Sequence, residues 1–80
     1  METDQTKRVT GLRQVTRAME QGVLLRAVIA QDADAPLKET LIAKLQQADI
    51  PYEFAASMKE LGQMCGINVG AAVMGHIQSA

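Results

Sequence analysis

The sequence predicts an α/β fold in which a single sheet carries short helices on both faces. Three observations support this expectation. Segments with the pattern of strands alternate with segments with the pattern of helices, 48% of the residues are hydrophobic, and glycine or proline stands near most segment boundaries. Alternation of this kind is typical of a sheet covered by its connecting helices. The length of 80 residues suits one domain, residues 1–80, in which residues 1–6 are expected to be a flexible N-terminus.

The first three expected elements are a strand, a helix and a second strand. Residues 7–10 form a short extended stretch that stops at Gly11. In residues 12–21, apolar and polar side chains separate onto opposite sides of a helix, and Gly22 suits the left-handed conformation that ends many helices. Residues 24–30 are a compact apolar run, as expected for a buried strand.

The middle of the chain predicts a second helix and a third strand. Asp34 can cap a helix whose first turn contains Pro36, and apolar residues recur behind them at helical spacing. Ile50 and Pro51 close this helix, because the residue before a proline disfavours helical geometry. Residues 52–56 are then expected to form a short strand.

The last two expected elements are a helix and a strand. Ser57 and Glu60 have the S-x-x-E spacing of a capping box, which opens a helix that continues through Cys65. Gly66 is the natural end of this helix. Residues 69–77 are rich in small and β-branched side chains, which favours a final strand packed closely under helices.

Three glycines, Gly62, Gly66 and Gly70, recur at four-residue spacing. They match neither the dinucleotide-binding motif nor the phosphate-binding loop motif, so a nucleotide site is not supported. We expect Gly62 to permit close packing and Gly70 to begin the last strand.

Enzyme and metal chemistry has little support in this sequence. Cys65 and His76 could act as nucleophile and base, but no third orienting group is visible, and a buried structural thiol is the simpler interpretation. Asp32 and Asp34 could hold Mg²⁺ after a strand, whereas in the simpler account Asp34 caps a helix and Asp32 is solvated. The sequence therefore predicts a protein that is not an enzyme and has no metal and no cofactor.

The expected location is the cytoplasm. Residues 1–8 are polar and charged, unlike a secretory signal, and a single cysteine cannot form an internal disulfide. The uncharged segment 61–80 contains polar side chains and four glycines, which a bilayer core tolerates poorly. We therefore expect no membrane partner.

Charge is unevenly distributed along the chain, although the formal net charge is only -1. Residues 7–26 carry five basic side chains against one acidic one, residues 31–60 carry three against six, and the last twenty residues carry none. A basic segment is modest evidence for a nucleic-acid partner and is also compatible with a solvated helix face. Because Tyr52 and Phe54 are the only aromatic residues, a surface of stacking rings is excluded.

The polar side of the first expected helix is the best candidate for contact with RNA. Gly11 allows a phosphate backbone to approach the helix N-terminus, where N–H groups favour anions. Arg13 can form two hydrogen bonds to guanine, Gln14 can bond a base edge, and Arg17 follows one turn later. A helix side of this composition is more often simply solvated, so this pattern alone does not decide the function.

Four segments, in order along the chain, share a pattern with one known family. They are Gly11-Leu12-Arg13-Gln14-Val15-Thr16-Arg17, Val28-Ile29-Ala30-Gln31-Asp32-Ala33-Asp34, Ile50-Pro51, and Ser57-Met58-Lys59-Glu60-Leu61-Gly62-Gln63-Met64-Cys65-Gly66-Ile67-Asn68-Val69. From about Lys7 to Ile77 the chain resembles the ribosomal protein L7Ae family, and its small bacterial members in particular. The most specific part of the resemblance is the motif L-G-x-x-C-G-I-x-V together with its spacing from the helix that follows Gly11.

The resemblance implies a three-layer α/β/α sandwich with one four-stranded mixed sheet, and binding to the kink-turn. The kink-turn is an RNA bend built on tandem sheared G·A pairs beside a bulge. In the family, the first helix enters the major groove at these pairs, and the loop before the last strand packs on an extruded nucleotide. Carried over by position, the implied RNA-binding residues are Gly11, Leu12, Arg13, Gln14, Arg17, Ile67, Asn68 and Val69.

The chain departs from the family pattern at a few of these places. Archaeal members carry Asn and Glu where this chain has Arg13 and Gln14, and Lys where Met58 stands, whereas small bacterial members have a basic residue, Gln and Met. Asn68 replaces an acidic residue that is common in the loop. These departures concern base preference and affinity more than the mode of binding.

The leading hypothesis is a non-enzymatic, bacterial, ribosome- or riboswitch-associated protein that binds kink-turn RNA. We expect a monomer with a structured RNA partner and no DNA partner. A net charge of -1 suits recognition of a bent RNA shape better than tight non-specific binding. The alternative is a protein–protein interaction module on the same fold, with the uncharged C-terminal loop as its contact surface.

Overall fold

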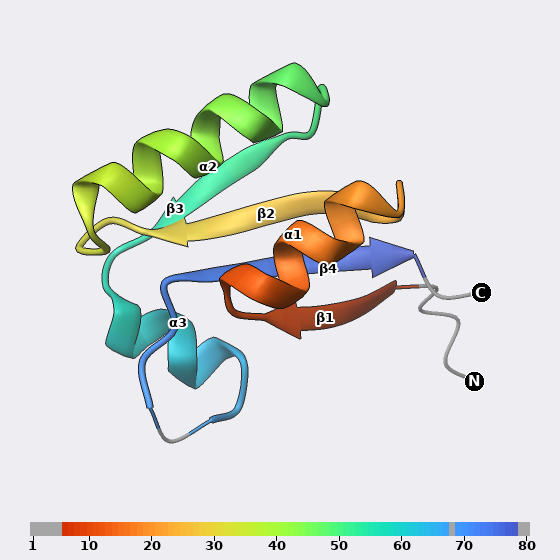
Figure 1. Ribbon diagram of the computed structural model, residues 1–80. Helices are drawn as coiled ribbons and strands as arrows, with labels where there is room; N and C mark the ends of the chain where they lie inside the picture. The colour runs from red at the N-terminus through yellow and green to blue at the C-terminus, as the bar shows by residue number, and fades with distance from the viewer. Residues whose placement is uncertain (1–5, 68, 79–80) are drawn as a thin grey trace, which may run out of the picture.

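The computed structural model describes residues 6–67 and 69–78, and its elements follow the predicted order (Figure 1). Of the expected flexible N-terminus, residues 1–5 lie outside the described residues, and Thr6 belongs to the first strand. The elements are β1 (Thr6–Thr10), α1 (Leu12–Glu20), β2 (Leu24–Ala30), α2 (Ala35–Gln47), β3 (Tyr52–Ala55), α3 (Met58–Met64) and β4 (Val73–Gln78).

The four strands form one mixed sheet in the order β1-β4-β2-β3. β2 and β3 are parallel because helix α2 carries the chain back across the sheet between them, whereas β4 is antiparallel to both β1 and β2. Strands β1, β2 and β3 therefore finish at the same end of the sheet, where β4 begins. We call this the helix-start end, because α1, α2 and α3 all begin there (Figure 1).

Helices cover both faces of the sheet, which confirms the predicted layers. α1 and α2 pack on one face, where a core cluster joins them to β2 and β4; its buried members are Val15, Ala18, Leu24, Ala27, Ile29, Leu41, Leu45 and Val73. α3 packs on the other face at the helix-start end, around Val28, Ala30, Ala33, Ala55, Leu61, Ala71 and Met74. Along β2 the alternation of side chains sends Ala27 and Ile29 to one cluster and Val28 and Ala30 to the other.

Each helix ends in the same hydrogen-bonded motif, with a left-handed residue just after its last turn. Gly22 and Gly66, both at φ 75°, occupy this position after α1 and α3, as predicted. After α2 the position is taken by Asp49 at φ 57°, while the Ile50 N–H donates to the Leu45 carbonyl at 2.9 Å. α2 therefore ends at Gln47, before the predicted stop at Ile50 and Pro51.

The helix starts differ in how they are capped. The Ser57 hydroxyl accepts a hydrogen bond from the Glu60 N–H at 3.0 Å, which confirms this part of the predicted capping box. Asp34 occupies the N-cap position of α2, but its side chain makes no capping hydrogen bond, so its predicted capping role is wrong. Asp32 is exposed, as expected, and it also accepts a hydrogen bond from the Met58 N–H at 2.7 Å, which caps α3.

The final strand is shorter than predicted, because it begins at Val73 rather than at residue 69. In the preceding segment, the Ala71 N–H donates to the Met58 carbonyl of α3 at 3.0 Å, and the Ala72 carbonyl accepts from the Ala30 N–H of β2 at 2.9 Å. Gly70 accordingly lies before the strand and does not begin it. A side chain on Gly62 would overlap the Val69 carbonyl oxygen, which confirms that Gly62 permits close packing.

Candidate nucleic-acid interface

The helix-start end of the sheet brings together two segments that are far apart in the sequence (Figure 1). The Gly11 N–H donates to the Val73 carbonyl at 2.9 Å, and this bond fixes the start of α1 beside the start of β4. The segment between α3 and β4, which carries Ile67 and Val69, leads directly into that strand. The start of α1 and the segment that carries Ile67 and Val69 therefore belong to one end of the molecule.

Gly11 holds the entry to α1 in a conformation that other residues rarely adopt, with φ 94° and ψ 157°. No atom outside its chain neighbours lies within 4 Å of the place where its Cβ would be, so the space beside it is open. No side chain in the described part of the chain caps α1. The first-turn N–H groups of α1 are thus available to an anion, which the helix dipole also favours.

Helix α1 presents the predicted polar side chains to solvent. Arg13 and Arg17 are exposed, and within residues 6–67 and 69–78 neither side chain makes a hydrogen bond or an ion pair. The Gln14 amide oxygen accepts a hydrogen bond from the Thr10 N–H at 3.2 Å, which leaves its NH₂ group as the outward donor. Leu12 is 43% exposed and adds apolar surface at the start of the helix.

The loop after α3 presents apolar side chains, as the resemblance implied. Ile67 is 38% exposed and Val69 is 70% exposed, and together with Lys59, Gln63 and Gly70 they line a hollow of about 210 Å³. The Ile67 N–H donates to the Gly62 carbonyl at 3.0 Å, which fixes the start of the loop on α3. Asn68 lies outside the described residues. An exposed, anchored apolar loop can pack against the face of an unstacked base.

Two charged side chains that the sequence reasoning did not place in the site hold α3 at its two ends. Asp32, from the loop between β2 and α2, bonds the first N–H of the helix, that of Met58. The Arg8 guanidinium, from β1, donates to the carbonyl of Met64, the last residue of the helix. Both contacts complement the helix dipole. Asp32 could have been suspected from its position directly after a strand, whereas nothing in the sequence pairs Arg8 with α3.

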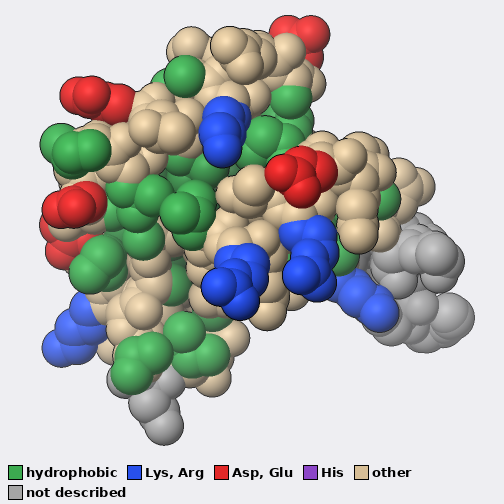
Figure 2. All heavy atoms as spheres, viewed as in Figure 1, with side chains coloured by type: hydrophobic (Ala, Val, Ile, Leu, Met, Phe, Trp, Pro, Cys, Tyr) green, Lys and Arg blue, Asp and Glu red, His purple; other side chains and the backbone are tan. Residues whose placement is uncertain are grey.

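The predicted basic segment is divided by the fold. Arg26 lies on β2 and forms an ion pair with Glu53 of β3, so it does not join α1. Arg8 is engaged with α3. The basic side chains of this segment that remain without a described partner include Arg13 and Arg17, and Figure 2 shows basic side chains gathered over α1. Within this segment, α1 itself therefore carries two cations without a described partner.

The described part of the chain was expected to hold no metal ion, and Cys65 was expected to be a structural thiol. Residues 6–67 and 69–78 contain no group of three His, Cys, Asp or Glu side chains arranged to hold a metal ion. Cys65 is a half-buried free thiol packed against the core cluster under α3. None of the described helices has the length and apolar character needed to cross a membrane, since even α2 has only 13 residues.

This fold, with an uncapped basic helix start beside an exposed apolar loop, is that of a small α/β RNA-binding protein. The model of the ribosomal protein L7Ae/L30e/S12e/Gadd45 family matches residues 1–79. The chain belongs to this family, and it is an RNA-binding protein rather than an enzyme.

Named relatives and solved structures support this assignment. The chain is 40% identical over 68 residues to an RNA-binding protein of Geobacillus thermodenitrificans and to the RNA-binding protein YbxF of Geobacillus stearothermophilus, covering 85% of this chain and 83% of each relative. A solved protein of unknown function from Bacillus halodurans superposes with a TM-score of 0.79 at 26% identity, covering 91% of this chain and 72% of that one. The Giardia lamblia 15.5kD RNA binding protein superposes with a TM-score of 0.77 at 25% identity, covering 91% and 61%.

Proposed function

We propose that this protein recognises kink-turn RNA. The observation that carries the proposal is the bond between the Gly11 N–H and the Val73 carbonyl, which joins the start of α1 to the strand that follows the apolar loop. A helix start that accepts phosphate and reads bases, beside a loop that accepts an extruded base, suits an RNA bend with both features. The kink-turn has sheared G·A pairs next to a bulged nucleotide.

In this proposal α1 reads the G·A pairs from the major groove. The backbone of Gly11 and Leu12 approaches the phosphates, where the first-turn N–H groups of the helix donate hydrogen bonds. Arg13 bonds two acceptors of a guanine, and the outward NH₂ group of Gln14 donates to a neighbouring base edge. Arg17, one turn further along, contacts flanking phosphates.

The loop after α3 takes the extruded nucleotide. Ile67 and Val69 place apolar atoms against one face of the base, and Asn68, between them, is assigned to the same contact. The bond from the Ile67 N–H to the Gly62 carbonyl holds the start of this contact surface on α3. The proposed partner is a structured ribosomal or riboswitch RNA, bound in the cytoplasm by a monomer that has no DNA partner.

The proposal is tested by following the bend itself. A kink-turn RNA labelled with donor and acceptor dyes on its two arms should show rising energy transfer when the protein is added. The same RNA with its G·A pairs changed to Watson–Crick pairs should show no rise. If neither RNA changes and neither binds, kink-turn recognition is excluded, and the exposed loop becomes a candidate protein contact.

A further inference from the structure

We propose that the groove between α1 and α2 is a second contact for the phosphate backbone of the same RNA, and that Lys44 supplies the contact from α2. This inference rests on the proposed function. It extends the binding surface beyond the residues that the family resemblance implies, because no residue of α2 is among them. Its chemistry is the attraction of unpaired cations for phosphodiester groups.

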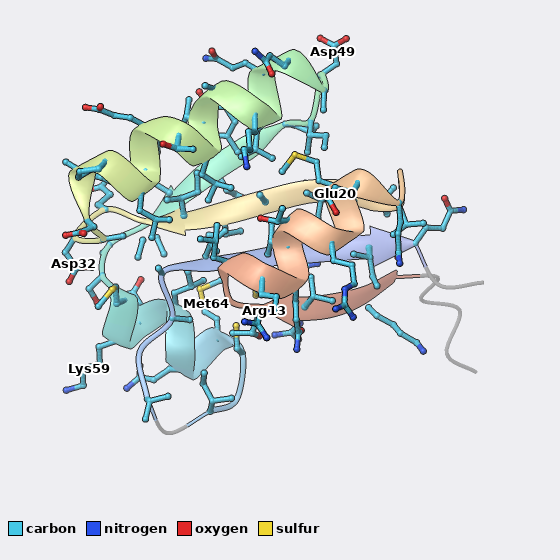
Figure 3. The ribbon with its side chains drawn as sticks, in the orientation of Figure 1. Arg13, Glu20, Asp32, Asp49, Lys59 and Met64 are labelled. Carbon is cyan, nitrogen blue, oxygen red and sulfur yellow. The ribbon has the colours of Figure 1, made fainter. Side chains whose placement is uncertain are left out.

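The groove runs along α1, is bordered by Lys44 of α2, and has a volume of about 720 Å³. It is lined by Leu12, Arg13, Thr16, Arg17, Glu20 and Lys44. Figure 3 shows Arg13 at the start of α1 and Glu20 at its end, so the groove follows the helix over its length. Nine residues of helix extend about 13 Å, which is long enough to pass more than one phosphate of an RNA strand.

The packing of α2 explains why Lys44 faces α1. Leu41 and Leu45 are buried at 1% and 0% exposure against the sheet, and both lie to one side of Lys44 around the helix, at about 60° and about 100° from it. α1 buries Val15 and Ala18 in the same cluster, so the two helices lie on one face with Lys44 at the edge of their seam. Figure 2 shows basic side chains over α1 and over the middle of α2.

The groove has more basic than acidic side chains, and these side chains are free to contact a ligand. Arg13, Arg17 and Lys44 face a single carboxylate, that of Glu20, and none of these four side chains has a hydrogen bond or an ion pair within the described parts of the chain. Other basic side chains are engaged elsewhere: Arg8 with the Met64 carbonyl, Arg26 with Glu53, and Lys38 with the Gln31 carbonyl. Cations left together without partners repel one another, and a polyanion relieves that repulsion.

Continuity with the α1 site favours RNA as the occupant. Leu12, Arg13 and Arg17 line the groove and also belong to the proposed kink-turn site. An RNA strand that leaves the start of α1 therefore meets Lys44 without crossing an acidic region other than Glu20. The carboxylate of Glu20 repels the phosphates. The proposal therefore predicts that neutralising Glu20 strengthens RNA binding, whereas neutralising Lys44 weakens it.

The test compares two charge-neutralising variants in the groove with two matched variants outside it. Lys44→Gln and Glu20→Gln alter the groove, whereas Lys38→Gln and Glu39→Gln alter exposed or half-buried positions of α2 away from it. Affinity for a kink-turn RNA with extended arms is measured between 50 and 200 mM salt, after circular dichroism has shown that every variant is folded.

Lys44→Gln should weaken binding on the order of threefold to tenfold at low salt, because one phosphate contact is lost. When the salt concentration rises from 50 to 200 mM, the affinity of both proteins falls. The fold-decrease should be about three times smaller for Lys44→Gln than for the unmodified protein, because one counterion fewer is released. Glu20→Gln should tighten binding about twofold to threefold, since a repulsion is removed. The two variants outside the groove should bind like the unmodified protein.

Two results would overturn parts of the account separately. If the unmodified protein binds the kink-turn but Lys44→Gln and Glu20→Gln bind with unchanged affinity and salt dependence, RNA does not enter the groove and the proposed function stands. If the unmodified protein does not bind the kink-turn at all, the proposed function fails and the groove proposal fails with it.

Discussion

At the scale of single residues, the site depends on backbone geometry as much as on side chains. Gly11 at φ 94° and ψ 157° turns the chain from β1 into α1, and the space beside it is open. Gly22, at φ 75° and with equally open surroundings, turns the chain out of the same helix at its far end. Both glycines thus adopt a positive φ that other residues rarely adopt, but only Gly11 lies at the proposed RNA contact.

This contrast predicts different outcomes for two alanine substitutions. Gly11→Ala should lower the free energy of unfolding by about 1 to 3 kcal/mol, because a Cβ is strained in that region, and should also weaken RNA binding. Gly22→Ala should cost about 1 kcal/mol of stability and leave affinity unchanged. Urea denaturation and RNA titration of both proteins measure the two effects. Equal RNA affinity of the two variants would remove Gly11 from the contact.

Arg13 and Gln14 are adjacent, yet the structure predicts that their substitutions differ. Arg13→Ala should weaken binding by about 1 to 3 kcal/mol with no change in stability, since its side chain has no partner in the described part of the chain. Gln14→Ala should lower stability as well, by about 1 kcal/mol, because the Thr10 N–H loses its acceptor. Thermal unfolding and calorimetric titration separate the two effects. A loss of stability in Arg13→Ala equal to that in Gln14→Ala would contradict this assignment.

At the scale of elements, α3 is a short helix held from outside. It has seven residues, too few to be stable alone, and its two ends bond to the Asp32 side chain and the Arg8 guanidinium. The Val69 carbonyl oxygen lies so close to Gly62 that no side chain fits there. The position of α3, and of the loop proposed to bind RNA after it, therefore depends on β1 and on the β2–α2 loop.

Asp32 is accordingly expected to act as a positioning residue for RNA binding. Asp32→Ala should lower stability by about 0.5 to 2 kcal/mol through loss of the cap, and should weaken RNA binding without removing any group that touches RNA. Asp32→Asn keeps a side-chain oxygen and should restore most of both losses. Hydrogen exchange of the α3 and loop amides should rise in the first variant only. Unaltered exchange in Asp32→Ala would show that the bond does not hold the helix.

The end of α2 offers a test of stability alone. Asp49 adopts φ 57°, where glycine is favoured and where α1 and α3 do carry glycine. Asp49→Gly should raise the free energy of unfolding by about 0.5 to 1 kcal/mol, and Asp49→Ala should lower it by a similar amount. Urea midpoints of the two variants give the answer. A lower midpoint for Asp49→Gly would mean that the carboxylate stabilises the turn more than the conformation costs.

At the scale of the whole molecule, the local parts of the fold were predictable and the contacts between elements were not. β2 was predicted at its observed bounds because a buried strand is a continuous apolar run, and the glycine-terminated helices followed from periodicity and end signals. The predicted start of β4 at residue 69 was wrong because the Ala71 N–H bonds to the Met58 carbonyl of α3, and sequence spacing does not encode that choice. Strand propensity cannot distinguish a ladder from an extended segment packed on a helix.

The same limit applies to the candidate site. The exposed polar side of α1 and the exposed apolar side chains of the loop after α3 could be predicted from the sequence, because helical periodicity and the family motif are local patterns. The separation of Arg26 from the basic residues of α1 could not be predicted from the sequence, since its ion pair with Glu53 depends on the parallel pairing of β2 and β3. Nothing in the sequence indicated that Lys44 lines the same groove as Arg13 and Arg17, because only the arrangement of α2 and α1 on one face of the sheet brings this about.

The central claim, specific recognition of the kink-turn, is tested most directly by calorimetric titration of the protein into two RNA duplexes at two salt concentrations. One duplex contains the kink-turn, and the other has its G·A pairs changed to Watson–Crick pairs. We expect submicromolar binding to the first and little binding to the second at both salt concentrations. Equal, weak and strongly salt-sensitive binding to both duplexes would contradict the account, because it would reduce α1 to a generic phosphate contact.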